Sequence, residues 1–303
     1  MQYILPNFLE EKLKKQYSSE EIEKIINGYT SNRVMSLRIN TIKTSKDKIE
    51  AELKQNNIKY TEVSWYNEAL IIENINENDI RKMNIYTDGE IYLQSLSSMI
   101  PVIVLEPKPG ENILDMAAAP GGKTTQISAI TGNQALITAA EKNKIRADRL
   151  RYNIEKQGAS GVNILNTDAS HLDSFFSFDR ILLDAPCSGS GTINLNNEKD
   201  MKFFNEELIN RSVKIQFELL KKAIQILKPG HEMVYSTCSI LKEENEENIK
   251  KILKNNKVEL VPINRDRFKD IDILSTDLPE TVTVTPTEKY EGFFVAKLMK
   301  NVC

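Results

Sequence analysis

The sequence predicts a doubly wound α/β fold, in which helices cover both faces of a mostly parallel sheet. Seven short apolar segments between residues 112 and 298 have the length and composition of strands. Stretches with helical spacing lie between them, and such alternation is typical of βαβ units. The chain has 303 residues, 40% of them hydrophobic and 27% charged, which is enough for one large domain and a smaller one.

The first ninety residues predict a small α/β module. Residues 1–30 carry apolar side chains at helical spacing, and residues 45–57 begin with a capping serine and continue as a helix. Three further segments predict strands: residues 35–42, 60–65 and 69–74. We therefore expect an N-terminal domain over residues 1–92 and a second domain over residues 93–303.

In the larger domain, the alternation of predicted strands and helices begins at residue 112. Its two longest predicted helices are residues 143–158 and 206–230. Its predicted strands are residues 112–118, 135–141, 162–168, 179–186, 232–238, 258–263 and 292–298. In such sheets ligands bind outside the carboxyl ends of the strands. The candidate site residues are therefore those at the ends: Ala117–Lys123, Glu141, Asp168, Asp184–Cys187 and Thr237–Cys238.

The loop after the first of these strands is similar to a phosphate-binding loop. Gly122, Lys123 and Thr124 match the end of that pattern, but Ala117 stands where its first glycine should be. Backbone N–H groups at the start of the next helix suit an anionic group. The alanines disfavour a deep wrap around a triphosphate, so a carboxylate or a nucleoside fits better. A tight turn without a ligand is the alternative.

Two acids also lie at strand ends. Glu141 comes 18 residues after Lys123, and an acid about 20 residues beyond the first turn typically bonds ribose hydroxyls. Asp168 ends the following strand in the same way. Either acid alone is more readily explained as a solvated strand-end residue, but together they favour a cofactor that carries a nucleoside.

The cysteines fall on the same predicted edge. Cys187 and Cys238 follow the fourth and fifth strands, and if these strands are neighbours, about 4.8 Å apart, both thiols can face one pocket. A small buried hydrophobe is the alternative for each. With Cys303 they form no C-x-x-C pair, and His171 and His231 lack metal-ligand spacing, so we expect neither a disulfide framework nor a metal site.

Charge and hydropathy limit the partners. The net charge of −3 argues against broad non-specific nucleic-acid binding, although residues 31–60 hold seven Lys or Arg against three acids. No apolar run reaches the roughly 18 residues of a membrane span, and the N-terminus lacks the layout of a secretory signal. We therefore expect a cytoplasmic protein without membrane contact.

Four segments together resemble one family: LDMAAAPGGKTTQ, DRILLDAPCSGSGT, VYSTCSILKEENEENI and EGFFVAKL. They are similar to motifs of the RNA (cytosine-5) methyltransferases of the NOL1/NOP2/Sun (RsmB/NOP) type, and SLRINTIKTS and QSLSSMIPVIVLEPKPGENILDM resemble its upstream segments. The resemblance runs from about residue 34 to residue 298. It implies a Rossmann-like class I methyltransferase domain, whose seven-stranded sheet has six parallel strands and one antiparallel strand.

The resemblance also implies a cofactor, S-adenosyl-L-methionine, and roles for the candidate residues. Glu141 would hold its ribose, Asp168 would lie near its adenine, and Asp184 would sit near the reacting centre. Cys238 would be the nucleophile, and Cys187 would help to release the product. The loop that would wrap the cofactor consists of Ala117, Ala118, Ala119, Pro120, Gly121, Gly122 and Lys123, the last of which is also a candidate catalytic residue.

The chemistry explains why such residues are needed. Cytosine C5 is too weak a nucleophile to accept a methyl group unaided, and addition of a thiolate at C6 activates the ring. Cysteine suits this step, because its pKa of about 8.5 leaves some thiolate near neutral pH. A second group must then remove the C5 proton, for which Cys187 is placed, and Asp184 would favour electron flow near N3. The base must leave any stack to reach the site.

Several expectations concern the substrate. We expect RNA as the partner, ribosomal RNA before transfer RNA, bound by a monomer in part through Arg33, Arg38 and Lys43. Residues 193–204 lack an arginine-rich stretch with a proline that many members carry, so RNA contacts there would be weaker or rearranged. The sequence ends soon after residue 298, so we expect no appended RNA-binding domain.

Three other functions compete with this one. A nucleotide hydrolase is disfavoured by Ala117 and has no use for two strand-end cysteines. A DNA cytosine methyltransferase would use the cysteine after the proline as its nucleophile and would carry a large recognition domain. A non-catalytic RNA-binding protein would not need Cys187, Cys238, Asp184 and Lys123 intact.

Overall fold

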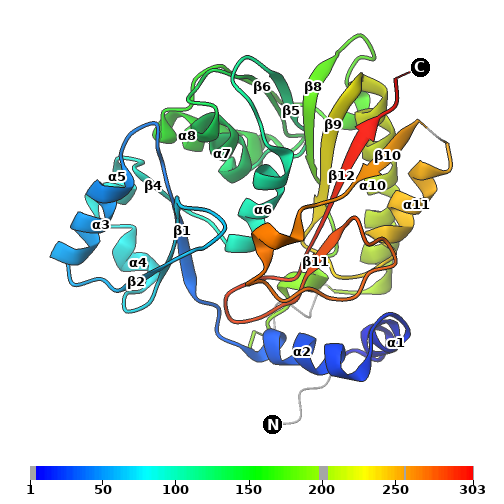
Figure 1. Cartoon of the computed structure of the whole chain (residues 1–303), viewed down its shortest axis with the longest axis horizontal. Helices are drawn as coiled ribbons and strands as arrows, with labels where there is room; N and C mark the ends of the chain where they lie inside the picture. Colours follow the sequence, from blue (N-terminus) through cyan, green and yellow to red (C-terminus); the bar gives the residue numbers. More distant parts are fainter. Residues whose placement is uncertain (1–4, 198–203, 256, 303) are drawn as a thin grey trace.

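The structure of the protein is a computed structural model that describes residues 5–197, 204–255 and 257–302. It contains two sheets (Figure 1), a small one built from the N-terminal part of the chain and a large one built from the rest. Both predicted sheets are therefore present. The mixed α/β class with a large, mostly parallel sheet is confirmed.

The small sheet is antiparallel and has the strand order β2-β3-β1-β4. Its strands are β1 (Met35–Ile39), β2 (Tyr60–Glu62), β3 (Ala69–Ile72) and β4 (Ile91–Leu93), and its helices are α3 (Lys46–Gln55), α4 (Glu77–Ile80) and α5 (Asn84–Thr87). The predicted cap of α3 is confirmed, since the side chain of Ser45 accepts a hydrogen bond from the backbone N–H of Lys48. Ile49 and Leu53 of α3 are buried against the sheet.

The first two helices, α1 (Asn7–Gln16) and α2 (Ser19–Thr30), pack away from the small sheet. Their apolar faces share a core with Ile193, Ile240 and Leu241, which belong to loops of the larger domain. Figure 1 shows the two helices below the large sheet. The N-terminal segment therefore reaches both parts of the fold, and the domain boundary at residue 92 stays a prediction.

The large sheet has the order β10-β12-β9-β8-β5-β6-β7, and β11 pairs with β12. Its strands are β5 (Asn112–Asp115), β6 (Leu136–Ala140), β7 (Val162–Leu165), β8 (Phe178–Asp184), β9 (Leu227–Thr237), β10 (Val258–Val261), β11 (Val282–Val284) and β12 (Phe293–Lys300). β12 runs antiparallel to both β9 and β10, whereas β9, β8, β5, β6 and β7 pair in parallel. The predicted arrangement of six parallel strands and one antiparallel strand is confirmed, and β11 is an additional short strand.

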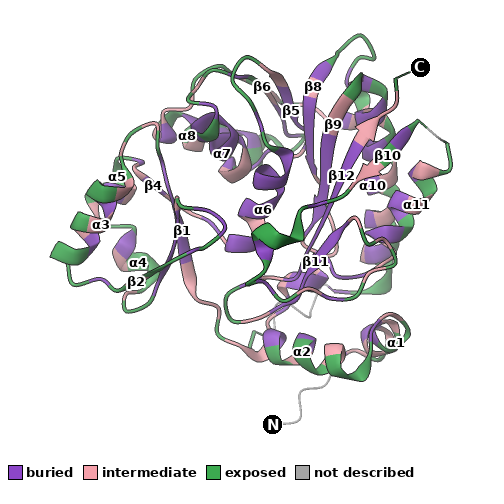
Figure 2. Cartoon of the chain, viewed as in Figure 1, coloured by how far each residue is buried: buried purple, intermediate pink, exposed green. Residues whose placement is uncertain are grey.

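Helices cover both faces of this sheet. Ile113 of β5 packs on the face covered by α6 (Leu96–Leu105) and α7 (Gly122–Ile130), while Leu114 packs on the opposite face, under α10 (Glu206–Ile226) and α11 (Glu246–Leu253). α8 (Lys144–Gln157) contacts α7 and β7. The strands and α6 form the buried centre of the molecule (Figure 2). Successive side chains of a strand point to opposite faces of the sheet. Because helices cover both faces, both sets of side chains are apolar, and the strands appear in the sequence as continuous apolar runs.

Two details differ from the prediction. α6 was not predicted; it is apolar on every side and contains Pro101, and it lies buried between the sheet and the small module. The predicted helix 206–230 ends at Ile226, because β9 already begins at Leu227 and carries Pro229, which a helix interior does not tolerate. Within the described part of the chain, every helix is too short or too polar to cross a membrane.

Candidate active site

The site lies at one edge of the large sheet, where parallel strands end together. β5 ends at Asp115 and β8 at Asp184, and Asp184 pairs with Ser236 next to the end of β9. The loops that follow these strands carry the alanine–glycine turn, Cys187 and Cys238. Each predicted candidate therefore lies at the edge that the alternation of strands and helices indicated.

The two cysteines meet directly. The Sγ atoms of Cys187 and Cys238 lie 3.1 Å apart, and both cysteines are free thiols. The hydrogen bond to Cys238, helped by burial, raises the pKa of the Cys187 thiol well above its ordinary value. Cys187 therefore keeps its proton more firmly than an ordinary cysteine and can donate it in a hydrogen bond to the sulfur of Cys238.

An ion pair stands beside the thiols. Lys123 Nζ lies 2.8 Å from Asp184 Oδ2 and donates to Ser98 Oγ at 2.7 Å, while the Ser236 hydroxyl donates to Asp184 Oδ1 at 2.8 Å. Burial alone would lower the pKa of Lys123, but the charge and hydrogen bond of Asp184 outweigh it, so the pKa is raised. A negative charge on Cys238 acts in the same direction. The Lys123 ammonium is therefore held in an ion pair with Asp184 at the edge that carries the two thiols.

A cavity of about 240 Å³ joins these groups to the two strand-end acids. Its lining includes Glu141 and Asp168 on one side and Asp184 and both cysteines on the other, with Ile215 and Leu219 of α10 as an apolar wall. All five predicted strand ends therefore contribute residues to one cavity. Nowhere among the residues that the structure describes do three or more His, Cys, Asp or Glu side chains gather to hold a metal ion.

The two acids are held in different ways. Glu141 is 4% exposed; its Oε1 accepts the Asn143 backbone N–H at 2.8 Å, and its Oε2 lies 3.5 Å from Arg146. Asp168 accepts two hydrogen bonds from Ser170, and these outweigh the effect of burial and lower the pKa of Asp168. Both side chains therefore offer carboxylate oxygens at the cavity.

The turn before α7 forms the wall between this cavity and a second one of about 250 Å³. Ala117, Ala119 and Asp184 line both cavities, and Lys123 lines the second. Gly121 has a φ of 109°, in the left-handed region that favours glycine. Two spaces that share the carboxylate of Asp184 suit two ligands that must meet.

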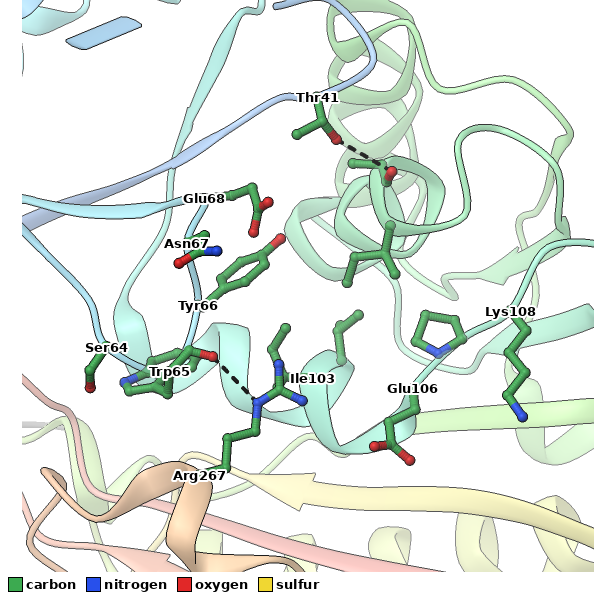
Figure 3. A pocket seen from close by; sticks show the side chains of 14 residues that line it. Thr41, Ser64, Trp65, Tyr66, Asn67, Glu68, Ile103, Glu106, Lys108 and Arg267 are labelled. Atoms are coloured by element: carbon green, nitrogen blue, oxygen red, sulfur yellow. Dashed lines mark hydrogen bonds between the residues drawn. The ribbon is translucent and has the colours of Figure 1, made fainter. Parts of the chain in front are cut away.

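A larger cavity than these two lies elsewhere (Figure 3). It has a volume of about 790 Å³, and its walls come from the loop between β2 and β3, the ends of α6 and α7, and Arg267. Figure 3 shows Trp65 and Tyr66 on one side of it and Glu106 and Lys108 on another. It contains none of the candidate residues, so cavity size does not identify the site.

The predicted basic surface is wrong in one respect. Arg38 is fully buried and donates to Gln94 Oε1 at 3.1 Å and to Thr125 Oγ1 at 2.9 Å, so it cannot form part of an exposed RNA-binding face. Arg33 is half-buried and donates to backbone carbonyls, and Lys43 is exposed. The expectation about residues 193–204 falls largely on residues 198–203, which lie outside the described residues.

One residue of the site was not predicted from the sequence. Glu244 is 0% exposed and accepts hydrogen bonds from Ser188 and Ser239, the residues that follow the two cysteines. In the sequence it stands in the acidic run KEENEEN, where a buried acid cannot be distinguished from surface ones. The only feature of the sequence that pointed to Glu244 as a site residue was its position in the segment that also carries Cys238.

Comparison with known proteins agrees with this geometry. The family described as 16S rRNA methyltransferase RsmB/F matches residues 102–299, and the RsmF/B-like, ferredoxin-like domain matches residues 5–77. The chain belongs to the RsmB/F methyltransferase family. The NOL1/NOP2/Sun resemblance that the sequence motifs indicated is thereby confirmed.

Relatives and solved structures cover the chain almost completely. It is 32% identical to ribosomal RNA small subunit methyltransferase F of Shewanella amazonensis over 88% of its own length and 58% of that protein. For the 28S rRNA (cytosine-C(5))-methyltransferase of Mus musculus the identity is 33%, over 98% of the chain and 39% of the relative. The chain spans about half the length of the curated relatives it matches.

The fold has close solved counterparts. The crystal structure of a methyltransferase homologue from Pyrococcus horikoshii superposes with a TM-score of 0.81 at 30% identity, covering 98% of this chain and 100% of the other. PH0851 gives a TM-score of 0.89 at 33% identity, over 98% of this chain and 66% of that one. These likenesses place both sheets within a known methyltransferase architecture.

Proposed function

We propose that the protein transfers a methyl group from S-adenosyl-L-methionine to C5 of a cytosine in RNA, through a covalent bond between Cys238 and C6. The observation that carries the proposal is the pair of thiols, 3.1 Å apart, beside the Lys123–Asp184 ion pair. A hydrolase or a simple RNA-binding protein has no use for two adjacent thiols at this edge. A reaction that adds and then expels a thiolate needs both.

The residues of the 240 Å³ cavity fit the cofactor. Glu141 supplies carboxylate oxygens for ribose hydroxyls, Asp168 lies farther along the same wall, and Ile215 and Leu219 offer an apolar surface for a base. The turn at Ala117–Gly122 leads into the N-terminus of α7, whose N–H groups suit the methionine carboxylate. When bound, S-adenosyl-L-methionine supplies a methyl group attached to a positively charged sulfur.

The residues of the chain would act in a fixed order. Cys238 attacks C6 as a thiolate, and the new S–C6 bond pushes the electrons of the C5–C6 double bond into the ring, which makes C5 nucleophilic. Asp184, positioned by Lys123 and Ser236, faces the ring near N3. After C5 has accepted the methyl group, its proton is removed, the double bond forms again, and the S–C6 bond breaks to free Cys238.

The division of labour between the cysteines has a physical basis. Because its pKa is raised, Cys187 is the poorer thiolate and the better hydrogen-bond donor to Cys238. The Lys123 ammonium also interacts electrostatically with Cys238. We therefore assign the attack to Cys238. Once Cys238 is bound to C6, the hydrogen bond that raised the pKa of Cys187 is lost, so Cys187 can release its own proton to water and then, as the thiolate, take up the C5 proton.

Ribosomal RNA is the proposed substrate, and transfer RNA is the alternative. Support comes from relatives that are named as small-subunit, 25S and 28S rRNA methyltransferases. We also propose residues 1–92 as the RNA-binding module and residues 93–303 as the methyltransferase domain. Bisulfite sequencing of ribosomal and transfer RNA after incubation with the protein and cofactor distinguishes the two substrates.

Single cysteine variants test the chemistry. Cys187→Ala can still attack C6 and accept the methyl group but cannot complete release, so a covalent protein–RNA complex should accumulate on a denaturing gel when cofactor is present. Cys238→Ala and the double variant should form none. If Cys238→Ala traps RNA and Cys187→Ala does not, the two roles are exchanged. If neither variant traps RNA and both stay active, the covalent mechanism is wrong.

A further inference from the structure

Glu244 is a buried carboxylate held by hydrogen bonds alone. It lies in the loop between β9 and α11, is 0% exposed, and has no Lys or Arg partner in the described part of the chain. Its Oε1 accepts the Ser188 N–H at 2.8 Å and the Gln216 side-chain amide at 3.1 Å; its Oε2 accepts the hydroxyls of Ser188 and Ser239, both at 2.5 Å. Burial of an ion costs so much free energy that such a carboxylate needs these partners.

Three of these hydrogen bonds connect the two cysteine loops. Ser188 is the residue after Cys187, and Ser239 is the residue after Cys238. The hydroxyls of Ser190 and Ser239 add a direct link at 2.8 Å. One carboxylate therefore helps to fix the distance between two segments whose hydrogen-bonded serines, Ser188 and Ser239, lie on the two cysteine loops.

The loop is anchored from beneath as well. The Tyr235 hydroxyl donates to the backbone carbonyl of Glu244 at 2.6 Å, and the Gln216 amide also donates to the carbonyl of Pro186 at 3.0 Å. Glu244 itself does not line the 240 Å³ cavity. Its effect on the reaction must therefore act through the loops or through its negative charge, which contributes to the raised pKa of Cys187.

We propose that Glu244 is a positioning residue that holds the thiols of Cys187 and Cys238 at their working separation. This inference rests on the proposed function, since it assigns Glu244 to the step in which Cys238 captures the base. Displacement of a reacting group by about 1 Å can cost roughly 100-fold in rate. Loss of the carboxylate removes its hydrogen bonds to both loops at once, although contacts such as Ser190–Ser239 and the bond from the Gly191 N–H to the Cys238 carbonyl still join them.

Three substitutions of Glu244 distinguish the effect of its side-chain length from the effect of its charge. Gln keeps one carbonyl oxygen for the two N–H donors, and its NH₂ can donate to the two serine hydroxyls, which are free to reverse. Asp keeps the charge but is one methylene shorter, and Ala keeps neither. We expect Glu244→Gln to retain capture within about tenfold, and Glu244→Asp and Glu244→Ala to lose about 100-fold.

The rate is measured on the capture step alone. Each substitution is made in the Cys187→Ala background, and formation of the covalent RNA complex is followed over time with cofactor present. Glu243→Ala is the matched control, because Glu243 is the preceding residue but pairs with Lys12 of α1 at 2.6 Å, away from the thiols. Cofactor affinity by calorimetry shows that each variant is folded. If Glu244→Ala does not fold, Ser239→Ala removes one of the four hydrogen bonds to the Glu244 carboxylate, together with the contacts of this hydroxyl to Ser190 and to the Leu241 N–H, and should slow capture less.

The outcomes are distinguishable. Faster capture of RNA by Glu244→Gln than by Glu244→Asp and Glu244→Ala, with unchanged cofactor affinity, supports the positioning role. Equal capture in all three variants and in the parent overturns it while leaving the proposed function intact. Faster capture by Glu244→Asp than by Glu244→Gln would mean that the charge matters more than the reach of the side chain, and this result also overturns the proposal. If the Cys187→Ala parent itself captures no RNA, the proposed function fails, and the inference fails with it.

Discussion

Glu141 offers a quantitative test of the cofactor site. In Glu141→Ala both carboxylate oxygens are lost; Oε1 is already engaged by the Asn143 N–H at 2.8 Å, whereas Oε2 has only a distant ion pair with Arg146 at 3.5 Å and is available to a ribose hydroxyl. A hydrogen bond to a charged group contributes about 1.5–3 kcal/mol. Because 1.4 kcal/mol corresponds to a tenfold change, the dissociation constant should rise about 10- to 150-fold.

The assay is calorimetric titration with S-adenosyl-L-methionine. Glu141→Gln should lose less, because its amide oxygen can still accept from Asn143 and its NH₂ can still meet a hydroxyl. Glu155→Ala, which removes an exposed acid from α8, the helix that follows Glu141 in the chain, should leave the affinity unchanged. Thermal unfolding shows whether α8 stays in place. Unchanged affinity in a folded Glu141→Ala would refute the assignment of this carboxylate to the ribose.

Two further predictions concern stability. Burial raises the pKa of Asp115 to about 6, whereas an unfolded aspartate has a pKa of about 3.9. Between these two pH values the folded protein binds more protons than the unfolded chain. The free energy of unfolding should therefore fall by about 2–3 kcal/mol as the pH rises from about 3.9 to about 6. Asp115→Asn should lack this decline in urea titrations from pH 4 to pH 7; an identical decline would contradict it. Arg38→Ala should lower the free energy of unfolding by about 2–4 kcal/mol, because it leaves Gln94 Oε1 without this donor and empties buried volume. It should leave the salt dependence of RNA binding unchanged, and a flatter salt slope at full stability would contradict this.

The strands and the site edge could be predicted because their signals are local. The apolar segments that became β5, β8 and β9 alternate with helices, and parallel strands place their carboxyl ends together whatever the details of packing. The meeting of Cys187 and Cys238 followed from neighbouring strands. The loop before α7 was predicted because its glycines and Lys123 lie within a few residues of each other.

Other features depend on contacts between distant parts of the chain. α6 has no polar face, so helical periodicity could not reveal it, and it becomes a helix where the small module and the sheet both bury it. Arg38 looked like a surface cation, since its hydrogen-bond partners Gln94 and Thr125 lie far along the sequence. Glu244 could not be distinguished from the other acids of its run, because its hydrogen-bond partners Ser188 and Gln216 also lie far along the sequence. A charged residue is recognised as buried only when its partners are known.

The most direct test of the central claim is to locate the covalent bond. Cys187→Ala is incubated with RNA and cofactor, the trapped complex is digested with nuclease and protease, and the peptides are sequenced by mass spectrometry. The account predicts a methylated cytidine attached to the peptide that contains Cys238, and no adduct when cofactor and RNA meet Cys238→Ala. An adduct on any other residue, or an active protein that never forms one, would contradict it.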